Sequence, residues 1–185
     1  GAATGGGGAE NYISNSNAEV NTAGWLVDSV SAAARPSGAL TGTSTGLTFT
    51  RTTTNPLNGI ASFLISKDAV NRQGRLAYYN LTLPAKSKAK VMSIRFPYRV
   101  VSGTFVVGST SVDSDCIVYV RQYNGSTYTW SEPSSFKFLS NSTTLADEFR
   151  AEFQTLSDTI SADLVFYVAT TSASAWVLAI DDVNL

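Results

Sequence analysis

Strict alternation of apolar and polar residues over the segment Met92–Val100 is the feature that most restricts how this chain can fold. Every second residue from Met92 to Val100 is apolar, and Ser93, Arg95 and Arg99 lie between them. Side chains of a β-strand alternate between two faces, so the pattern predicts a strand with one buried face. Pro97 has no backbone N–H to donate, which predicts a bulge or a sheet edge at that position.

Other short segments have the β-branched and aromatic composition of strands and are followed by turn residues. They are Gly46–Arg51, Ala61–Ile65, Leu76–Leu83, Cys116–Tyr123, Thr127–Trp130, Phe136–Leu139, Leu164–Ala169 and Trp176–Asp181. About ten short strands without a long helix predict an all-β fold, an antiparallel β-sandwich or jelly roll, with a closed barrel as the alternative. Asn124 and Gly125 predict a type I′ turn that joins two of these strands in a hairpin.

One segment fits two structures. Leu145, Phe149, Phe153 and Leu156 have helical spacing, whereas Phe149, Ala151 and Phe153 alternate as in a strand. Periodicity alone slightly favours the helix.

The chain contains no histidine and a single cysteine, Cys116. It therefore cannot form a Ser-His-Asp or Cys-His triad, a His-ligated metal site or an intrachain disulfide. The apolar neighbours Ile117 and Val118 predict that the Cys116 thiol is buried and inert. A net charge of -1 argues against nucleic-acid binding, and no apolar stretch is long enough to predict membrane insertion.

Charged residues make up only 15% of the chain, whereas 24 serines and 21 threonines supply polarity without charge. This composition is typical of secreted or virion β-proteins. Residues 1–10 are rich in glycine, which predicts a linker or arm. We expect residues 11–185 to form a single jelly-roll β-sandwich domain.

Four stretches of the chain share a family pattern in the same order. They are Asn11–Glu19 followed by Gly24 and Trp25, then Asn58–Lys67, Phe149–Asp158 and Ile180–Leu185. They resemble the N-x-I-x-N-x-x-F-E opening and Gly-Trp, the G-x-x-S-L-x strand, the W-x-x-F-x-F-T strand and the closing I-D-D-V-x-L strand of family 4 and 9 carbohydrate-binding modules. The resemblance implies a galactose-binding-like or carbohydrate-binding-module-like jelly roll, in which the ambiguous segment is a strand. The segments Ala18–Thr22 and Lys67–Gly74 also look like jelly-roll domains of tail fibres and other virion proteins of tailed bacteriophages.

In modules of this family the first and last strands commonly enclose a structural calcium ion. The resemblance places Glu19 and Asp181 at matching positions, with Lys67 as the donor of a backbone carbonyl. Calcium takes only oxygen ligands, which suits a chain without histidine. Ala18 stands where the family usually has Phe, and the alternative is that these acids are hydrogen-bond acceptors in turns.

Sugar binding by a β-sandwich requires flat aromatic faces and a few placed polar groups. The candidates are Trp130, Tyr128 and Tyr123 around the hairpin, Tyr78 and Tyr79 in their strand, and Arg121 and Gln122 as polar partners. We expect Trp25 and Trp176 in the core, whereas the polar neighbours of Trp130 are as consistent with exposure as with burial.

Paired carboxylates, which could hydrolyse a glycosidic bond, occur at Asp113/Asp115, Asp147/Glu148 and Asp181/Asp182. No pattern places one of them in an apolar pocket that would raise its pKa, so we expect no enzymatic activity.

The sequence and the resemblance together predict a non-catalytic, carbohydrate-binding-like domain of a phage tail fibre or receptor-binding protein that contacts host-surface glycans. Such a domain would lie on a virion or outside the cell, and the resemblance to fibres implies a homotrimer. One alternative is a capsid or tail decoration protein that binds other virion subunits. A second is a carbohydrate-binding module of a secreted bacterial glycanase. Burial of Tyr123, Tyr128 and Trp130 would exclude sugar binding, because a sugar needs exposed rings.

Overall fold

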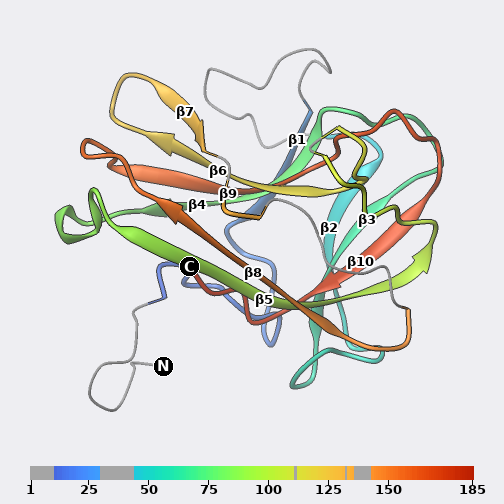
Figure 1. Ribbon diagram of the computed structural model, residues 1–185. Helices are drawn as coiled ribbons and strands as arrows, with labels where there is room; N and C mark the ends of the chain where they lie inside the picture. Colours follow the sequence, from blue (N-terminus) through green and yellow to red (C-terminus); the bar gives the residue numbers. More distant parts are fainter. Residues whose placement is uncertain (1–10, 30–43, 111, 132, 136–142) are drawn as a thin grey trace.

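Two antiparallel five-stranded sheets pack face to face in the computed structural model (Figure 1). The structure describes residues 11–29, 44–110, 112–131, 133–135 and 143–185. Sheet A has the strand order β1-β4-β9-β6-β7, and sheet B has the order β2-β3-β10-β5-β8. The predicted antiparallel β-sandwich is confirmed, and the alternative of a closed barrel is wrong because each sheet keeps its own two edges.

The strands of sheet A are β1 (Trp25–Ser29), β4 (Arg75–Thr82), β6 (Ile117–Tyr123), β7 (Tyr128–Ser131) and β9 (Ser161–Tyr167). Those of sheet B are β2 (Leu47–Thr52), β3 (Ser62–Lys67), β5 (Val91–Gly103), β8 (Asp147–Gln154) and β10 (Trp176–Ile180). In the part of the chain that the structure describes, no helix is long and apolar enough to cross a membrane; the helical element there is the short 3-10 turn η1 (Ala85–Ser87).

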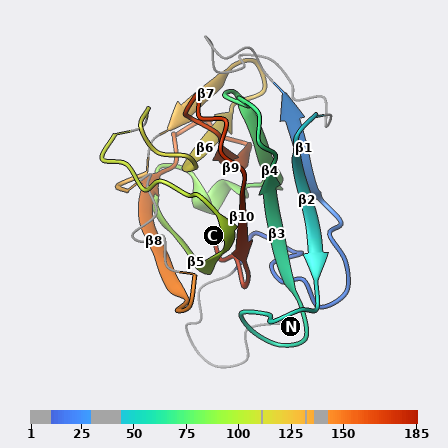
Figure 2. The same cartoon turned by 90° about the vertical axis from the view of Figure 1, so that its right-hand side faces the viewer.

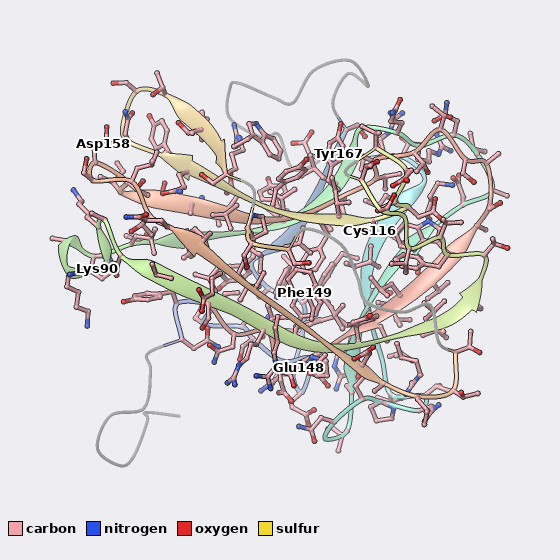
Figure 3. All side chains as sticks on the ribbon, viewed as in Figure 1. Lys90, Cys116, Glu148, Phe149, Asp158 and Tyr167 are labelled. Carbon is pink, nitrogen blue, oxygen red and sulfur yellow. The ribbon has the colours of Figure 1, made fainter. Side chains whose placement is uncertain are left out.

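The ambiguous segment is strand β8, as the resemblance implied, and the helix that periodicity favoured is wrong. Phe149, Ala151 and Phe153 are buried, whereas Arg150 and Glu152 are exposed. Figure 3 shows Phe149 between the sheets and Glu148 on the outer side of sheet B. The strand predicted at 136–139 lies outside the described residues, and β1 was not predicted from the sequence.

The hairpin of β6 and β7 is confirmed, but its predicted turn type is wrong. Tyr123 and Tyr128 form the last pair of the ladder, so the loop runs from Asn124 to Thr127. Gly125 has a positive φ of 99°, whereas Asn124 does not have a positive φ. The side-chain oxygen of Asn124 instead accepts a hydrogen bond from the amide of Thr127 at 2.8 Å and closes the turn.

Pro97 lies in an interior strand, because β5 is between β10 and β8, so the predicted sheet edge is wrong. The other predicted irregularity, a bulge, does occur in β5: Val177 of β10 pairs with Ser102 and Leu178 with Val100, so Val101 is the extra residue. At Pro97 itself, the pairing with the segment that follows β10 is interrupted. The ladder between β10 and β5 ends at Ile180, Asp182 has a φ of 42°, and pairing resumes where Asn184 and Arg95 exchange hydrogen bonds of 2.8 and 2.9 Å.

A continuous row of aromatic rings joins the inner faces of the two sheets. Phe49 of β2 stacks on Trp25 of β1 at 4.8 Å between ring centroids, and Trp25 lies 6.1 Å from Phe166 of β9. Phe166 lies 5.4 Å from Phe96 of β5, which stacks on Phe149 of β8 at 4.8 Å. The row crosses from one edge strand of sheet B to the other through sheet A. Figure 2 shows the edge strands β1 of sheet A and β2 of sheet B side by side.

Three further predictions about the core are confirmed. Trp25 and Trp176 are 5% and 1% exposed, and Cys116 is 2% exposed. Burial raises the pKa of the Cys116 thiol, which keeps it in the unreactive protonated form.

The two ends of the described chain are hydrogen-bonded to each other. The amide of Tyr12 donates to the carbonyl of Leu185 at 2.8 Å, and the side-chain amide of Asn11 donates to the carbonyl of Val183 at 3.0 Å. The amide of Val183 donates to the carbonyl of Ser16 at 2.8 Å. The N-terminal segment is thereby held beside the C-terminal residues, as Figure 1 shows.

Phe166 connects the two halves of the aromatic row, so its removal tests the core. We expect Phe166→Ala to lower the free energy of unfolding by about 3–5 kcal/mol, because it leaves a cavity between both sheets. Urea unfolding followed by tryptophan fluorescence measures this loss. Leu156→Ala, at a side chain that is 39% exposed, is the control and should cost less than about 1 kcal/mol; equal losses in the two variants would contradict the assignment.

Candidate functional site

Five of the seven carbohydrate-binding candidates, Tyr78, Arg121, Tyr123, Tyr128 and Trp130, lie on the outer face of sheet A, which we define as the face directed away from sheet B. Alternation along the strands places Tyr78 of β4, and Arg121 and Tyr123 of β6, on this face. The ladder of β6 and β7 pairs Arg121 with Trp130 and Tyr123 with Tyr128. Residues far apart in the sequence are therefore brought together.

Arg121 is the centre of this face. Its side chain is 1% exposed, and its Nη1 atom lies 2.9 Å from Oδ2 of Asp163 in β9. The guanidinium carbon is 3.6 Å from the centroid of the Tyr128 ring and 6.0 Å from that of Trp130. Asn80 donates a hydrogen bond of 2.8 Å to Oδ1 of Asp163, so both oxygens of that carboxylate are bonded.

Three aromatic rings on this face are only partly buried, namely Tyr123, Tyr128 and Trp130. Tyr123 stacks on Tyr128 with 4.4 Å between centroids. Trp130 meets Tyr119 and Tyr167 edge to face, at 5.6 and 6.3 Å. The condition that would have excluded sugar binding, complete burial of all three rings, is therefore not met.

An apolar floor lies beside these rings. It is formed by Leu76, Tyr78, Ile117, Tyr119, Val165, Tyr167 and Ala169. Figure 3 labels Tyr167 on the side of the molecule opposite Glu148, which projects from sheet B. The outer faces of the two sheets thus differ: sheet A carries apolar and aromatic groups, whereas sheet B carries charged residues such as Arg95 and Glu148.

Tyr78 lies close to the charged groups of the face. Burial raises the pKa of its phenol, and the carboxylates of Asp28 and Asp163 raise the pKa further. Asp28, in β1, is 3% exposed. Tyr78 therefore stays protonated at neutral pH and can donate a hydrogen bond.

Sequence reasoning missed several members of this face and placed two residues wrongly. Asp163 was missed because the predicted strand began one residue too late, at Leu164. Tyr79 points into the core, where its hydroxyl lies 2.6 Å from that of Ser14. Gln122 also points inward and donates to the carbonyl of Gln154, so neither Tyr79 nor Gln122 can contact a sugar on the outer face.

The first predicted calcium ligand, Glu19, holds the chain just before β3. Its carboxylate accepts hydrogen bonds from the amides of Ile60, at 3.1 Å, and Ala61, at 3.4 Å. Gly59 has a φ of 59°, and a Cβ there would collide with this carboxylate. A glycine at this position is therefore needed for Glu19 to reach the backbone.

The backbone oxygens beside this carboxylate already bind a cation. Arg51 of β2 donates through Nε to the carbonyl of Ala18 and through Nη2 to the carbonyl of Glu19, the latter at 2.9 Å. The guanidinium thereby links the N-terminal segment to sheet B.

Asp181 lies near the same segment, but Lys67 does not. Asp181 is 1% exposed and accepts hydrogen bonds from Oγ of Ser62 at 3.1 Å and from the amide of Asp182 at 2.8 Å. Lys67 is at the other end of β3, five residues and roughly 16 Å from Ser62. Its ammonium donates to the carbonyls of Asp68 and Ser174 at 2.9 and 2.8 Å, and burial lowers its pKa.

These three residues do not fit a shared calcium site. The oxygens near Glu19 accept bonds from Arg51 and backbone amides, and Lys67 is distant from Asp181. Among the described residues, no group of three or more Asp, Glu or Cys side chains is placed to hold a metal ion.

Carboxylates of the three predicted pairs accept hydrogen bonds or form ion pairs within the described structure. Backbone and side-chain hydrogen bonds from Thr110 and Ser109 hold the pKa of Asp113 at about 2, and Asp115 is buried and accepts from the amide of Val106 at 2.7 Å. Glu148 is paired with Arg150 at 3.1 Å.

Comparisons with known proteins identify the fold. No family model matches the sequence, and neither does any curated protein. Among solved structures, the tandem CBM22-1–CBM22-2 domains of Paenibacillus barcinonensis Xyn10C align with a TM-score of 0.62 and 12% identity, over 95% of this chain and 44% of that chain. The CBM22-1 xylan-binding domain of the same protein aligns with a TM-score of 0.56 and 11% identity, over 91% of this chain and 88% of that one.

A phage protein has a similar fold. The enzymatically active domain of tailspike protein 4 from bacteriophage CBA120 aligns with a TM-score of 0.59 and 14% identity, over 94% of this chain but 21% of the tailspike chain. The chain thus has the jelly-roll fold of carbohydrate-binding modules. The modules named here belong to family 22, so the narrower resemblance to families 4 and 9 is not confirmed.

Replacement of the Arg51 cation tests whether it fastens the N-terminal segment. We expect Arg51→Ala to lower the free energy of unfolding by about 2–3 kcal/mol, because two carbonyls lose a charged donor. The matched control is Arg95→Ala, which removes an exposed guanidinium. Urea unfolding with and without a calcium chelator completes the test: wild-type midpoints should coincide, and a chelator-dependent loss would instead support calcium.

The buried Asp181 carboxylate predicts a specific pH dependence. Burial raises its pKa above the ordinary value of 3.8, so its contribution to stability is full below that value and is lost as the pH rises through the folded-state pKa. We expect the free energy of unfolding of the wild type, relative to Asp181→Asn, to fall from pH 3 toward pH 7. Urea unfolding at a series of pH values measures the difference, and a constant difference would refute the prediction.

Proposed function

We propose that this protein is a non-catalytic domain that binds glycans on the outer face of sheet A. The observation that carries the proposal is the pairing of partly exposed rings, Tyr123, Tyr128 and Trp130, with the buried ion pair of Arg121 and Asp163 on that face. Trp130 packs against a second buried cluster on this face, and the three rings remain partly exposed beside that cluster.

The cost of the ion pair supports a binding role. Taking a guanidinium and a carboxylate out of water is expensive, and replacing such a pair by apolar residues is often neutral or stabilising. Arg121 and Asp163 are nevertheless 1% and 4% exposed on an outer sheet face. Because both side chains are buried, the pair contributes by fixing the Tyr128 ring, whose centroid lies 3.6 Å from the guanidinium carbon of Arg121, and not by direct contact with a ligand.

The rings supply the second requirement of a sugar site. A pyranose has an apolar face that packs on a flat aromatic ring and hydroxyl groups that need hydrogen-bond partners. Trp130 and Tyr128 present rings beside Arg121, while Asn80 and Tyr78 carry polar groups on β4, which β9 separates from β6. In this proposal Trp130 and Tyr128 pack on the sugar, the buried pair of Arg121 and Asp163 fixes the Tyr128 ring, and the exposed Asn80 bonds sugar hydroxyls.

The likeness to the xylan-binding CBM22-1 domain supports the same class of ligand. We also propose a location on a virion or outside the cell. The tailspike likeness supports a phage receptor-binding protein that contacts host-surface glycans, which is the assignment we favour. The xylanase likeness supports the alternative of a module in a secreted bacterial glycanase.

Loss of the Trp130 ring provides the direct test. We expect Trp130→Ala to weaken glycan binding at least tenfold, because the variant loses a ring that packs on the sugar. The melting temperature should change little, because this ring is only partly buried. A glycan array selects the ligand, with xylohexaose as one defined probe, and isothermal titration calorimetry measures affinity.

Thr129→Ala is the matched control, since Thr129 is the neighbouring residue in β7 and alternation directs it to the opposite face. Binding lost in both variants, or in neither, would contradict the proposed face. A folded wild type that binds no glycan on the array would favour a decoration role.

A further inference from the structure

Lysines are concentrated at one turn of the molecule. Three of the five lysines in the chain, Lys86, Lys88 and Lys90, occur within five residues between β4 and β5. Figure 3 places Lys90 at one end of the sandwich, far from Tyr167 on the outer face of sheet A. Three ammonium groups on one short turn give this end of the molecule a positive potential.

The turn is held in a defined shape. The hydroxyl of Ser87 lies 2.8 Å from that of Tyr12, and the hydroxyl of Thr155 accepts a hydrogen bond of 2.9 Å from the amide of Lys90. Thr155 is 2% exposed and also donates to the carbonyl of Ser87. Ala89 has a φ of 52°, which a residue other than glycine adopts only where its surroundings fix it.

A hollow of about 290 Å³ lies next to this turn. Its polar side chains are those of Lys86, Lys90, Tyr12, Ser87, Ser93 and Asn184, and Val91, Met92 and Leu185 complete the lining. No Asp or Glu side chain lines it. Asp158, at the neighbouring turn, accepts a hydrogen bond from Asn124 and is not part of the lining.

We propose that this hollow is a second binding site, which takes an oxyanion such as a sulfate, phosphate or carboxylate group of an acidic polysaccharide. The ammonium groups of Lys86 and Lys90 supply positive charge, and the hydroxyl and amide groups supply donors for the anion oxygens. The site is at the end of the sandwich that carries η1, so it does not depend on glycan binding by sheet A.

Two other hollows among the described residues are weaker candidates. One of about 380 Å³ and one of about 310 Å³ flank Arg95 and Arg150, which face each other across β5 and β8. Glu148 and Asp182 line the first and Glu152 lines the second, so carboxylate side chains offset the charge of the two arginines wholly or in part. These arginines therefore serve as the matched control.

The test is titration of the full chain at low ionic strength with a sulfated heparin hexasaccharide, followed by calorimetry and amide NMR. We expect binding that weakens with added salt, and chemical-shift changes at the amides of residues 86–90. The double variant Lys86→Gln/Lys90→Gln should bind at least tenfold more weakly. Its melting temperature should be unchanged, because both side chains are exposed.

The control Arg95→Gln/Arg150→Gln removes the same charge elsewhere and should bind as the wild type does. Inorganic phosphate and inorganic sulfate, each added alone, should displace the hexasaccharide. The proposal would be overturned if the hexasaccharide did not bind, or if it bound without chemical-shift changes at residues 86–90. Equal losses of affinity in both double variants would also overturn it. Trp130→Ala should retain this binding, which separates failure here from failure of the proposal for sheet A.

Discussion

The architecture depends on the aromatic row that passes from Phe49 through Trp25, Phe166 and Phe96 to Phe149. Stacked and edge-to-face rings prefer particular distances and angles, so their contacts restrict how the two sheets are placed relative to each other. Because the row begins and ends on opposite edges of sheet B and passes through sheet A, it fixes the two sheets as one unit. The packing of the two inner faces therefore does not involve the side chains on the outer faces.

Because the aromatic row joins the inner faces, the outer face of sheet A can hold charged groups that would destabilise the packing between the sheets. Arg121 and Asp163 are buried, and the cost of removing their charges from water is compensated by their ion pair, by the hydrogen bond from Asn80 and by the contact of the guanidinium with the Tyr128 ring. Their partners lie on the neighbouring strands β4, β7 and β9, so the fold itself sets the positions of these groups. Such preorganisation would lower the entropic cost of the glycan binding that we propose.

Local sequence patterns predicted many of the strands. Alternation over Met92–Val100 and the composition of the hairpin predicted strands and their buried faces, because each depends on neighbours in sequence, whereas they left the burial of Trp130 open. Asp163 and Arg51 escaped notice because their partners come from other strands, and register is decided by contacts between distant segments. Lys67 shows the limit of a family resemblance: its position in the motif matched, but its side chain and its distance from Asp181 are set by this chain's own loops.

The pairing of the chain ends has a mechanical consequence. Residues 11 and 185 are adjacent, so a force that separates them loads the hydrogen bonds of Tyr12, Asn11 and Val183 one after another, as in unzipping. Strands sheared along their length would resist together and fail at a higher force.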